Sequence, residues 1–126
     1  MKMNTISELR AAFIAGTYTP AEAVEEALKV IAEKNGDINA FLHVYEDAKA
    51  TAIEATDLYK KGGELPPLLG IPVAIKNNIL IKGKKATASS KMLENYTATY
   101  DATIIKRLRD AGAIFIGSTN MDEFAM

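Results

Sequence analysis

The sequence contains no cysteine and only one histidine, His43. These absences exclude disulfide bonds and thiol nucleophiles from this stretch, and they leave too few ligands for a zinc site to be expected. No aspartate or serine pattern surrounds His43, so we expect it to be a structural or surface residue. We expect this chain to bind neither a metal nor a cofactor.

Long apolar runs and an excess of charge are missing as well. No segment approaches the ~20 consecutive apolar residues that a membrane-spanning helix needs, and no signal-peptide core follows the lysine near the N-terminus. The net charge is −1, which gives no basic footprint for non-specific nucleic-acid binding. We therefore expect a cytoplasmic protein that contacts no membrane.

The composition is typical of a folded globular protein, with 48% hydrophobic and 25% charged residues. A chain of 126 residues suits one domain or part of one. Its patterns divide it into residues 1–65, which are mainly helical, and residues 66–126, which indicate a βαβ segment. We predict an α/β fold in which N-terminal helices precede the first parallel strands, and we expect that fold to be incomplete.

A helix start is encoded at Thr19 in the first, helical part. Thr19 offers an N-cap hydroxyl, Pro20 occupies the first helical position, and Glu22 completes a capping box. We predict that this helix stops at residues 35–36, Asn-Gly, and that an earlier helix ends at Gly16.

A short strand is predicted from Ala40 to Tyr45, where aromatic and aliphatic residues alternate. Another helix should follow from residue 48 and end at Gly62-Gly63.

The second part favours a strand in "IPVAI", a helix in "DATIIKRLRDAG" and a strand in "AIFIGSTN". Asp101 is the predicted N-cap of this helix and Gly112 follows its C-terminus. The two strands should be parallel neighbours joined by a right-handed crossover. One layer of helix cannot cover both faces of such a sheet, so we expect a larger fold, a partner chain, or self-association through exposed strand edges.

Lys76 ends the first of these strands, and chemistry in open α/β sheets gathers at the carboxyl ends of parallel strands. Desolvation there would lower the lysine pKa, and the neutral amine could then accept a proton from a serine hydroxyl, directly or through a second hydroxyl. The alternative is a lysine that extends from the strand end into water.

Three stretches, "GIPVAIKNNI", "SSKMLENYTATYDAT" and "GSTNMDEFAM", closely resemble the amidase signature family. Within that family, "SKMLENY" and "TNMDEFAM" are most similar to the A subunit of the tRNA-dependent amidotransferases that act on Glu-tRNA(Gln) and Asp-tRNA(Asn). The likeness is tight from residue 69 to residue 126. It implies a large mixed sheet wrapped by helices, of which this chain supplies the N-terminal part.

The resemblance also implies a Ser–cis-Ser–Lys mechanism in which Lys76 matches the catalytic lysine. The nucleophilic serine would attack the side-chain amide of glutamine, and the ammonia would pass to a partner subunit that activates misacylated tRNA with ATP and Mg²⁺. The implied partners are the other amidotransferase subunits and, through them, tRNA, or the remaining part of the same domain.

Two departures bear on activity. Both family serines belong after "MDEFAM" and are absent from this sequence, so we expect the chain to be inactive alone. Asn77 stands where the family usually has aspartate, and strand alternation predicts that it points away from Lys76. Alternatives are a non-catalytic binding or assembly module derived from an amidase and a fragment of a small-amide amidase.

Supporting roles near the lysine are predicted for Asn77, Asn78, Asn120 and Asp122, although helix capping would also explain Asp122 and Glu123. Backbone capping or solvent contact is expected for Ser89, Ser90 and Ser118. The basic cluster Lys82, Lys84 and Lys85 is predicted to be a solvated loop, with contact to acidic partners or tRNA as the alternative.

Overall fold

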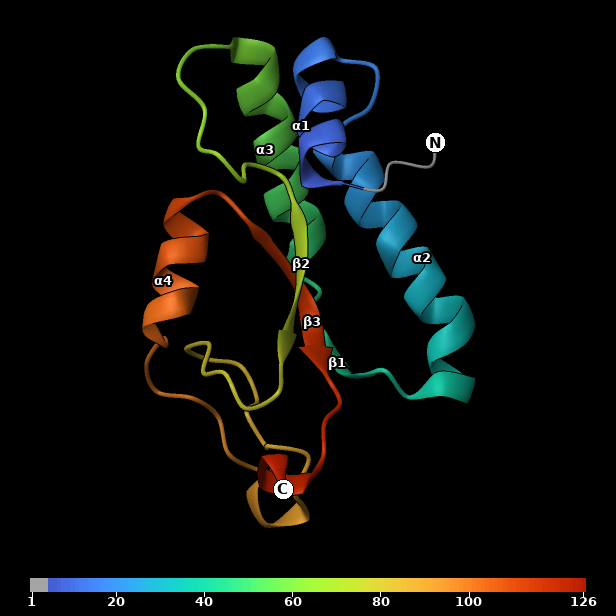
Figure 1. Ribbon diagram of the computed structural model, residues 1–126, viewed down its shortest axis with the longest axis vertical. Coiled ribbons are helices and arrows are strands. Elements are labelled where there is room, and N and C mark those ends of the chain that lie inside the picture. The colour runs from blue at the N-terminus through green and yellow to red at the C-terminus, as the bar shows by residue number, and fades with distance from the viewer. Residues whose placement is uncertain (1–4) are drawn as a thin grey trace.

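The computed structural model describes residues 5–126, so the start of the segment considered above for a signal peptide, residues 1–4, lies outside it. Figure 1 shows the elements in chain order, and their bounds are α1 (Ile6–Ala15), α2 (Pro20–Ile38), β1 (Phe41–Val44), α3 (Ala48–Lys61), β2 (Pro72–Lys76), the 3₁₀ helix η1 (Lys91–Leu93), α4 (Thr103–Asp110), β3 (Ile114–Thr119) and the 3₁₀ helix η2 (Glu123–Ala125). Within residues 5–126 no helix is both long and apolar enough to cross a membrane.

The starts of the first two helices follow from local chemistry. Thr19 and Glu22 form the predicted capping box at the start of α2, with Pro20 at its first position. Thr5 and Glu8 form a second capping box at the start of α1, and that helix ends at Gly16, which has a φ of 68°. Each box satisfies backbone N–H groups that the first turn leaves without partners.

The predicted end of α2 at residues 35–36 is wrong. The helix continues through Gly36 to Ile38 and ends at Asn39, which adopts left-handed φ and ψ angles of 53° and 38°. The side chain of Asn35 donates to the Phe41 carbonyl at 2.9 Å and accepts from the Phe41 N–H at 2.8 Å. Asn35 therefore links α2 to β1. One glycine within a helix lowers the stability of that helix by only about 1 kcal/mol, so α2 can continue through Gly36.

The three strands lie in the order β1-β3-β2, with β2 parallel to β3 as predicted. β1 adds an antiparallel pairing on the other side of β3, so the sheet is mixed. Gly117 permits this approach, because a Cβ there would lie 2.4 Å from the His43 carbonyl oxygen and 2.9 Å from the Phe41 ring.

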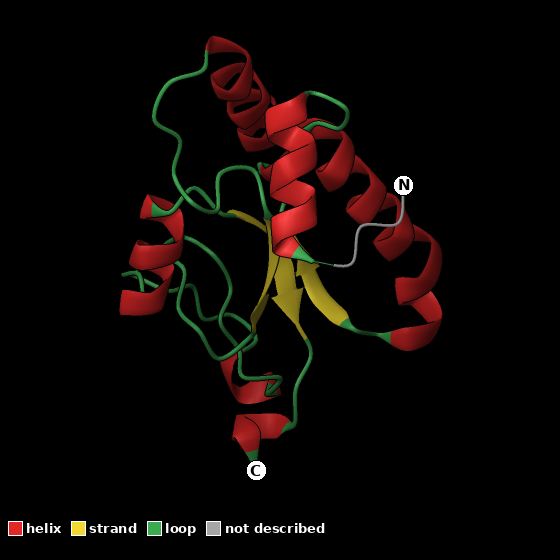
Figure 2. Cartoon of the chain, turned by 45° about the horizontal axis from the view of Figure 1, so that its top comes forward, coloured by secondary structure: helices red, strands yellow, loops and turns green. Residues whose placement is uncertain are grey.

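Helices cover the two sheet faces unequally. On one face, α2 and α3 enclose a core with β3, formed by Val24, Ala48, Ala52, Ala55, Leu69, Ile114 and Ile116. On the other face, α4 contributes Ile105 to a cluster with Tyr45, Ile75 and Ile81. Figures 1 and 2 show both 3₁₀ helices beyond the carboxyl ends of β2 and β3.

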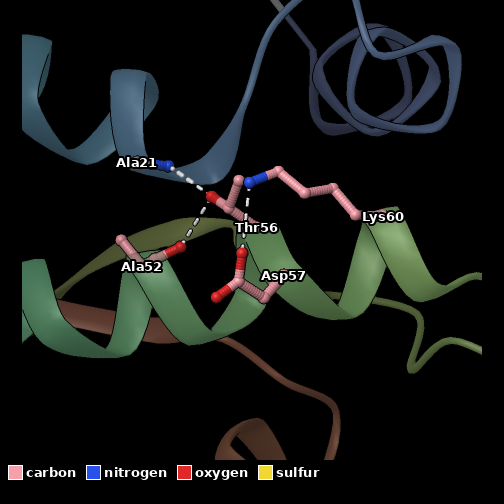
Figure 3. Close-up of polar contacts among 5 residues, drawn as sticks. All are labelled: Ala21, Ala52, Thr56, Asp57 and Lys60. Carbon is pink, nitrogen blue, oxygen red and sulfur yellow. Dashed lines mark hydrogen bonds and ion pairs between the residues drawn. The ribbon is translucent and has the colours of Figure 1, made fainter.

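A buried hydroxyl joins α2 to α3. The Thr56 hydroxyl donates to the Ala52 carbonyl at 2.8 Å and accepts from the Ala21 N–H in the first turn of α2 at 3.1 Å (Figure 3). The adjacent ion pair between Lys60 and Asp57 is exposed, so it contributes little to stability. That ion pair lies within α3, whereas the Thr56 hydroxyl links α3 to α2.

The assignment of Asp101 as the N-cap of α4 is also wrong. The N-cap is Ala102, and no side chain caps this helix. The Asp101 carboxylate instead accepts from the Lys82 N–H at 2.8 Å and pairs with Arg109. The Arg109 hydrogen bond and the Lys82 N–H hold the pKa of Asp101 below its usual range. Asp101 thus joins the loop after β2 to α4.

Replacing Gly112 or Gly36 by alanine should have opposite effects on stability, because only Gly112 has a backbone conformation that alanine rarely adopts. Gly112 has a φ of 88°, and a Cβ there would lie 2.7 Å from the Leu69 Cα, so Gly112→Ala should lower the free energy of unfolding by at least about 2 kcal/mol. Gly36 is helical with open space around it, so Gly36→Ala should raise that energy by about 1 kcal/mol. Urea denaturation measures both changes, and a neutral Gly112→Ala would contradict the close approach of Gly112 to Leu69.

The single histidine should make stability depend on pH. Burial lowers the pKa of His43, the Lys85 charge lowers it further, and Nδ1 has no hydrogen-bond partner among the described residues. The unfolded chain therefore binds the proton first, so stability should fall as the pH drops below about 6.5 towards the folded-state pKa. An NMR titration of His43, together with denaturation at pH 7.5 and pH 5, measures this effect.

Two substitutions that each remove one lysine charge test the cause of the lowered His43 pKa. Lys85→Met should move the His43 pKa back towards its usual value and reduce the loss of stability at low pH, because it removes the second cause of the shift. Lys60→Met, on the exposed surface of α3, should leave the titration unchanged. A His43 pKa at or above its usual value in the unmodified chain would contradict the burial of His43 near Lys85.

Candidate functional site

Lys76 lies where the sequence places it, at the carboxyl end of β2 and in register with Thr119 of β3. Its side chain is exposed and borders an open hollow of about 490 Å³ that is also lined by Asn120, Met121, Asp122 and Ala125. Among residues 5–126, Lys76 Nζ makes no hydrogen bond or ion pair. The described residues therefore do not shield the Lys76 amine from water as predicted. The side chain extends from the strand end into solvent, which was the alternative interpretation.

Asn77 is buried on the opposite side of the strand end, with 1% of its surface exposed. Its side-chain oxygen accepts from the Thr87 N–H at 3.0 Å, from the Thr87 hydroxyl and from the Ser89 N–H at 3.4 Å. Its side-chain nitrogen donates to the Ser118 hydroxyl at 3.0 Å. The change from exposed Lys76 to buried Asn77 agrees with the predicted alternation.

The backbone on either side of Lys76 is also fixed. The Asn77 N–H donates to the Thr119 carbonyl at 3.1 Å, which extends the parallel pairing by one bond. The Asn77 carbonyl accepts from the Ala88 N–H at 3.2 Å, and the Lys76 carbonyl accepts from the Ile79 N–H at 2.9 Å. These bonds set the direction in which the lysine side chain leaves the sheet.

Residues 120–125 form the wall of the hollow that faces Lys76, and the loop of residues 87–90, which Asn77 binds, contacts this wall. The Ser89 hydroxyl donates to Asn120 Oδ1 at 2.9 Å and accepts from the Met121 N–H at 3.1 Å. The Phe124 N–H donates to the Ala88 carbonyl at 3.0 Å. Ala88 and Ser89 both have left-handed φ angles, 49° and 53°, a conformation that is uncommon outside glycine and is maintained here by these bonds.

One interpretation of the neighbouring acidic residues needs correction. Asp122 and Glu123 do not act as caps: Asp122 makes no side-chain capping bond, and Glu123 accepts from the Ser90 hydroxyl at 2.6 Å. Ser90 also caps η1 as predicted, accepting from the Met92 N–H at 3.2 Å.

The other predicted site residues divide into two groups. Asn120 and Asp122 line the hollow beside Lys76, and the Asn120 side chain also donates to the Asn39 carbonyl at 3.0 Å. Asn78 is not brought to this hollow; it borders a separate apolar depression with Leu80 and Tyr96. The structure therefore groups Asn120 and Asp122 with the lysine, with Asn77 behind them.

Sequence reasoning missed the role of Ser118. A capping or solvent role was expected, yet Ser118 is 2% exposed and accepts a hydrogen bond from Asn77. Burial raises the pKa of the Tyr45 phenol, and a hydrogen bond with Ser118 opposes that rise. A period-two strand pattern places Ser118 on a face but does not identify its partners, so nothing in the sequence pointed to this contact.

The predicted solvated basic loop is wrong for Lys84. Its amine pairs with both Asp47 carboxylate oxygens at 2.9 Å and lies 4.7 Å from the centre of the Tyr45 ring. These contacts fasten the loop after β2 to the start of α3. Lys84 is therefore already engaged within the chain.

The site thus combines an unpaired amine, a carboxylate and a carboxamide around a hollow that opens to solvent. Ser89, Ser90 and Ser118 are bonded elsewhere, so none of these hydroxyls contacts Lys76. Within the described part of the chain, no group of three or more His, Cys, Asp or Glu residues could hold a metal ion. The hollow leaves the Lys76 amine accessible to hydroxyl groups that enter it.

Known proteins share both the sequence and this architecture. The family model described as Amidase matches residues 22–126. The A subunit of glutamyl-tRNA(Gln) amidotransferase from Rhodopirellula baltica is 44% identical over 125 residues, covering 98% of this chain and 25% of that protein. The corresponding protein of Thermobifida fusca is 46% identical over 121 residues, covering 95% and 24%. The chain spans about a quarter of the length of these relatives.

Solved structures show the same fold. A peptide amidase from Stenotrophomonas maltophilia matches with a TM-score of 0.89 at 30% identity, covering 96% of this chain and 25% of that one. The A subunit of glutamyl-tRNA(Gln) amidotransferase from Thermotoga maritima matches with a TM-score of 0.66 at 33% identity, covering 85% and 21%. The predicted α/β class and the predicted resemblance are confirmed. The chain belongs to the amidase signature family.

Proposed function

We propose that this chain is the lysine-bearing N-terminal portion of the A subunit of a tRNA-dependent amidotransferase. The observation that carries the proposal is the position of Lys76, whose unpaired amine leaves the carboxyl end of β2 beside the hollow. The level of identity to several such subunits, 42–46% over nearly the whole chain, supports the substrate class.

In the proposed reaction, Lys76 accepts a proton from a bridging serine as that serine takes one from the nucleophilic serine. The nucleophilic oxygen attacks the side-chain carbonyl carbon of glutamine. The C–N bond then breaks as the leaving nitrogen takes back the proton from Lys76 through the bridging serine, so that ammonia leaves and the acyl-enzyme forms. Water then releases glutamate. Ammonia would pass to a partner subunit that would use ATP and Mg²⁺ to activate the misacylated tRNA.

The two serines of this mechanism must come from outside the described residues. Ser89, Ser90 and Ser118 each have other partners, and their bonds build the wall of the hollow or the support behind it. The chain is therefore proposed to supply the proton acceptor and part of the scaffold, and it should be inactive alone.

A chimera tests the proposal. Residues 1–126 would replace the matching quarter of the Rhodopirellula baltica relative, and ammonia release from glutamine would be measured in the presence of its partner subunits. The chimera should be active, and Lys76→Met should lower the rate about 10³-fold, because a positioned proton acceptor typically contributes that much. The isolated chain should release no ammonia from glutamine.

Lys82→Met is the matched control, because Lys82 is an exposed lysine in the loop beyond β2. It should leave the rate within about twofold, since exposed substitutions rarely perturb a site. Equal rates for the chimera and its Lys76→Met variant would overturn the catalytic assignment. A folded, inactive chimera that still retains the partner subunits would instead favour the assembly module.

A further inference from the structure

We propose that Asn77 is a positioning residue for the Lys76 site, which holds the far wall of the hollow in place through the loop of residues 87–90. The role of the hollow as part of an active site rests on the proposed function. The hydrogen-bonded link from Asn77 to the wall does not depend on that function. Asn77 does not line the hollow, and its side chain lies on the other side of the strand end.

The first step is the orientation of the Asn77 side chain. The Thr87 N–H can only donate, so the atom that faces it must be the side-chain oxygen, at 3.0 Å. The side-chain nitrogen therefore faces Ser118 and donates to its oxygen at 3.0 Å. The Ser118 proton is then free to point towards Tyr45, in keeping with the hydrogen bond that acts on that phenol.

The second step is the path from Asn77 to the wall. Asn77 fixes Thr87 and Ser89 by side-chain bonds and Ala88 by a backbone bond. Ser89 in turn binds Asn120 and the Met121 N–H, while the Ala88 carbonyl binds the Phe124 N–H. The Asn77 bonds and the wall bonds therefore meet in two adjacent residues with left-handed backbones.

The third step concerns which side chains could replace Asn77. An aspartate would still accept from Thr87 and Ser89, and it would accept from Ser118 if that hydroxyl rotated away from Tyr45. The linkage therefore depends on a hydrogen-bonding group of this shape and does not depend on a nitrogen. Leucine, of similar size, would leave the Thr87 and Ser89 N–H groups without their acceptor.

The test is the native-state backbone dynamics of the 126-residue chain, measured as ¹⁵N order parameters. In Asn77→Leu, residues 121–124 should change from rigid values near 0.85 to values below about 0.6. Asn120, which the Asn39 and Ala40 carbonyls still hold, and residues 20–38 of α2 should stay rigid. Asn77→Asp should restore the rigid values. The matched control, Asn95→Leu, changes an exposed loop asparagine and should have no effect.

Ser89→Ala keeps the test decisive if Asn77→Leu fails to fold. It removes only the hydroxyl that joins Asn120 and Met121, so Met121 should become more mobile while the Asn77 side-chain amide protons stay protected from exchange. Rigid residues 121–124 in a folded Asn77→Leu variant, or a Met121 that stays as rigid in Ser89→Ala as in the unmodified chain, would overturn the proposal. Equal loosening of α2 would overturn it too, since that would be a loss of packing throughout.

The amidotransferase chimera adds a functional readout. Asn77→Leu should lower kcat by at least about tenfold with a smaller change in KM, and Asn77→Asp should recover most of it, because the wall is misplaced and the amine is intact. An inactive chimera would defeat the proposed function and leave the dynamics experiment to decide the role of Asn77.

Discussion

The hydrogen bonds of one buried amide support the three segments on which the lysine site depends. Asn77 joins the end of β2, the end of β3 and the loop of residues 87–90 from a position that is almost fully buried. A buried polar side chain left without partners costs about 1–3 kcal/mol for each group. The interaction therefore favours an arrangement in which all three segments are in place together.

Strand alternation lets this support and the reactive group lie next to each other in sequence without competing. Asn77 turns into the core and Lys76 turns out to the hollow, so the amine makes no bond to the groups that hold its backbone. A neutral amide also avoids the desolvation cost of a buried charge beside Ser118 and Thr87. Rigidity at the strand end is thus obtained while the lysine remains available.

The parts of the fold that sequence predicts are those set by near neighbours. The capping box at Thr19 and the glycine end of α1 need only residues a few positions apart, and the parallel pairing of β2 and β3 follows from the βαβ order. Asp101 was misassigned as a cap because its partner Lys82 lies 19 positions away. Capping preferences cannot anticipate such a competitor, and the same holds for the continuation of α2 through Gly36.

In the candidate site, too, only the features that depend on near neighbours in the sequence could be predicted. The position of Lys76 at a strand end could be predicted from a short apolar run, and the family of the chain from the surrounding motifs. Ser118 could not, because its bond to Asn77 spans 41 positions and depends on which residues become neighbours in the sheet. The capping role given to Glu123 was wrong for a related reason, because its partner Ser90 lies 33 positions away in the sequence.

The exposure of Lys76 limits the directions from which the two serines of the proposed reaction can approach it. The described wall, residues 120–125, borders the amine on one side, and the hollow stays open to water on the other. Any segment that brings the two serines to the amine must occupy that open side, and it then removes water as it delivers the hydroxyls. Shielding and the supply of a nucleophile would therefore arise in one event. A wall held firmly by Asn77 and Ser89 matters for this reason, because the incoming segment must meet a surface of fixed shape if the hydroxyl is to lie within hydrogen-bond reach of the lysine.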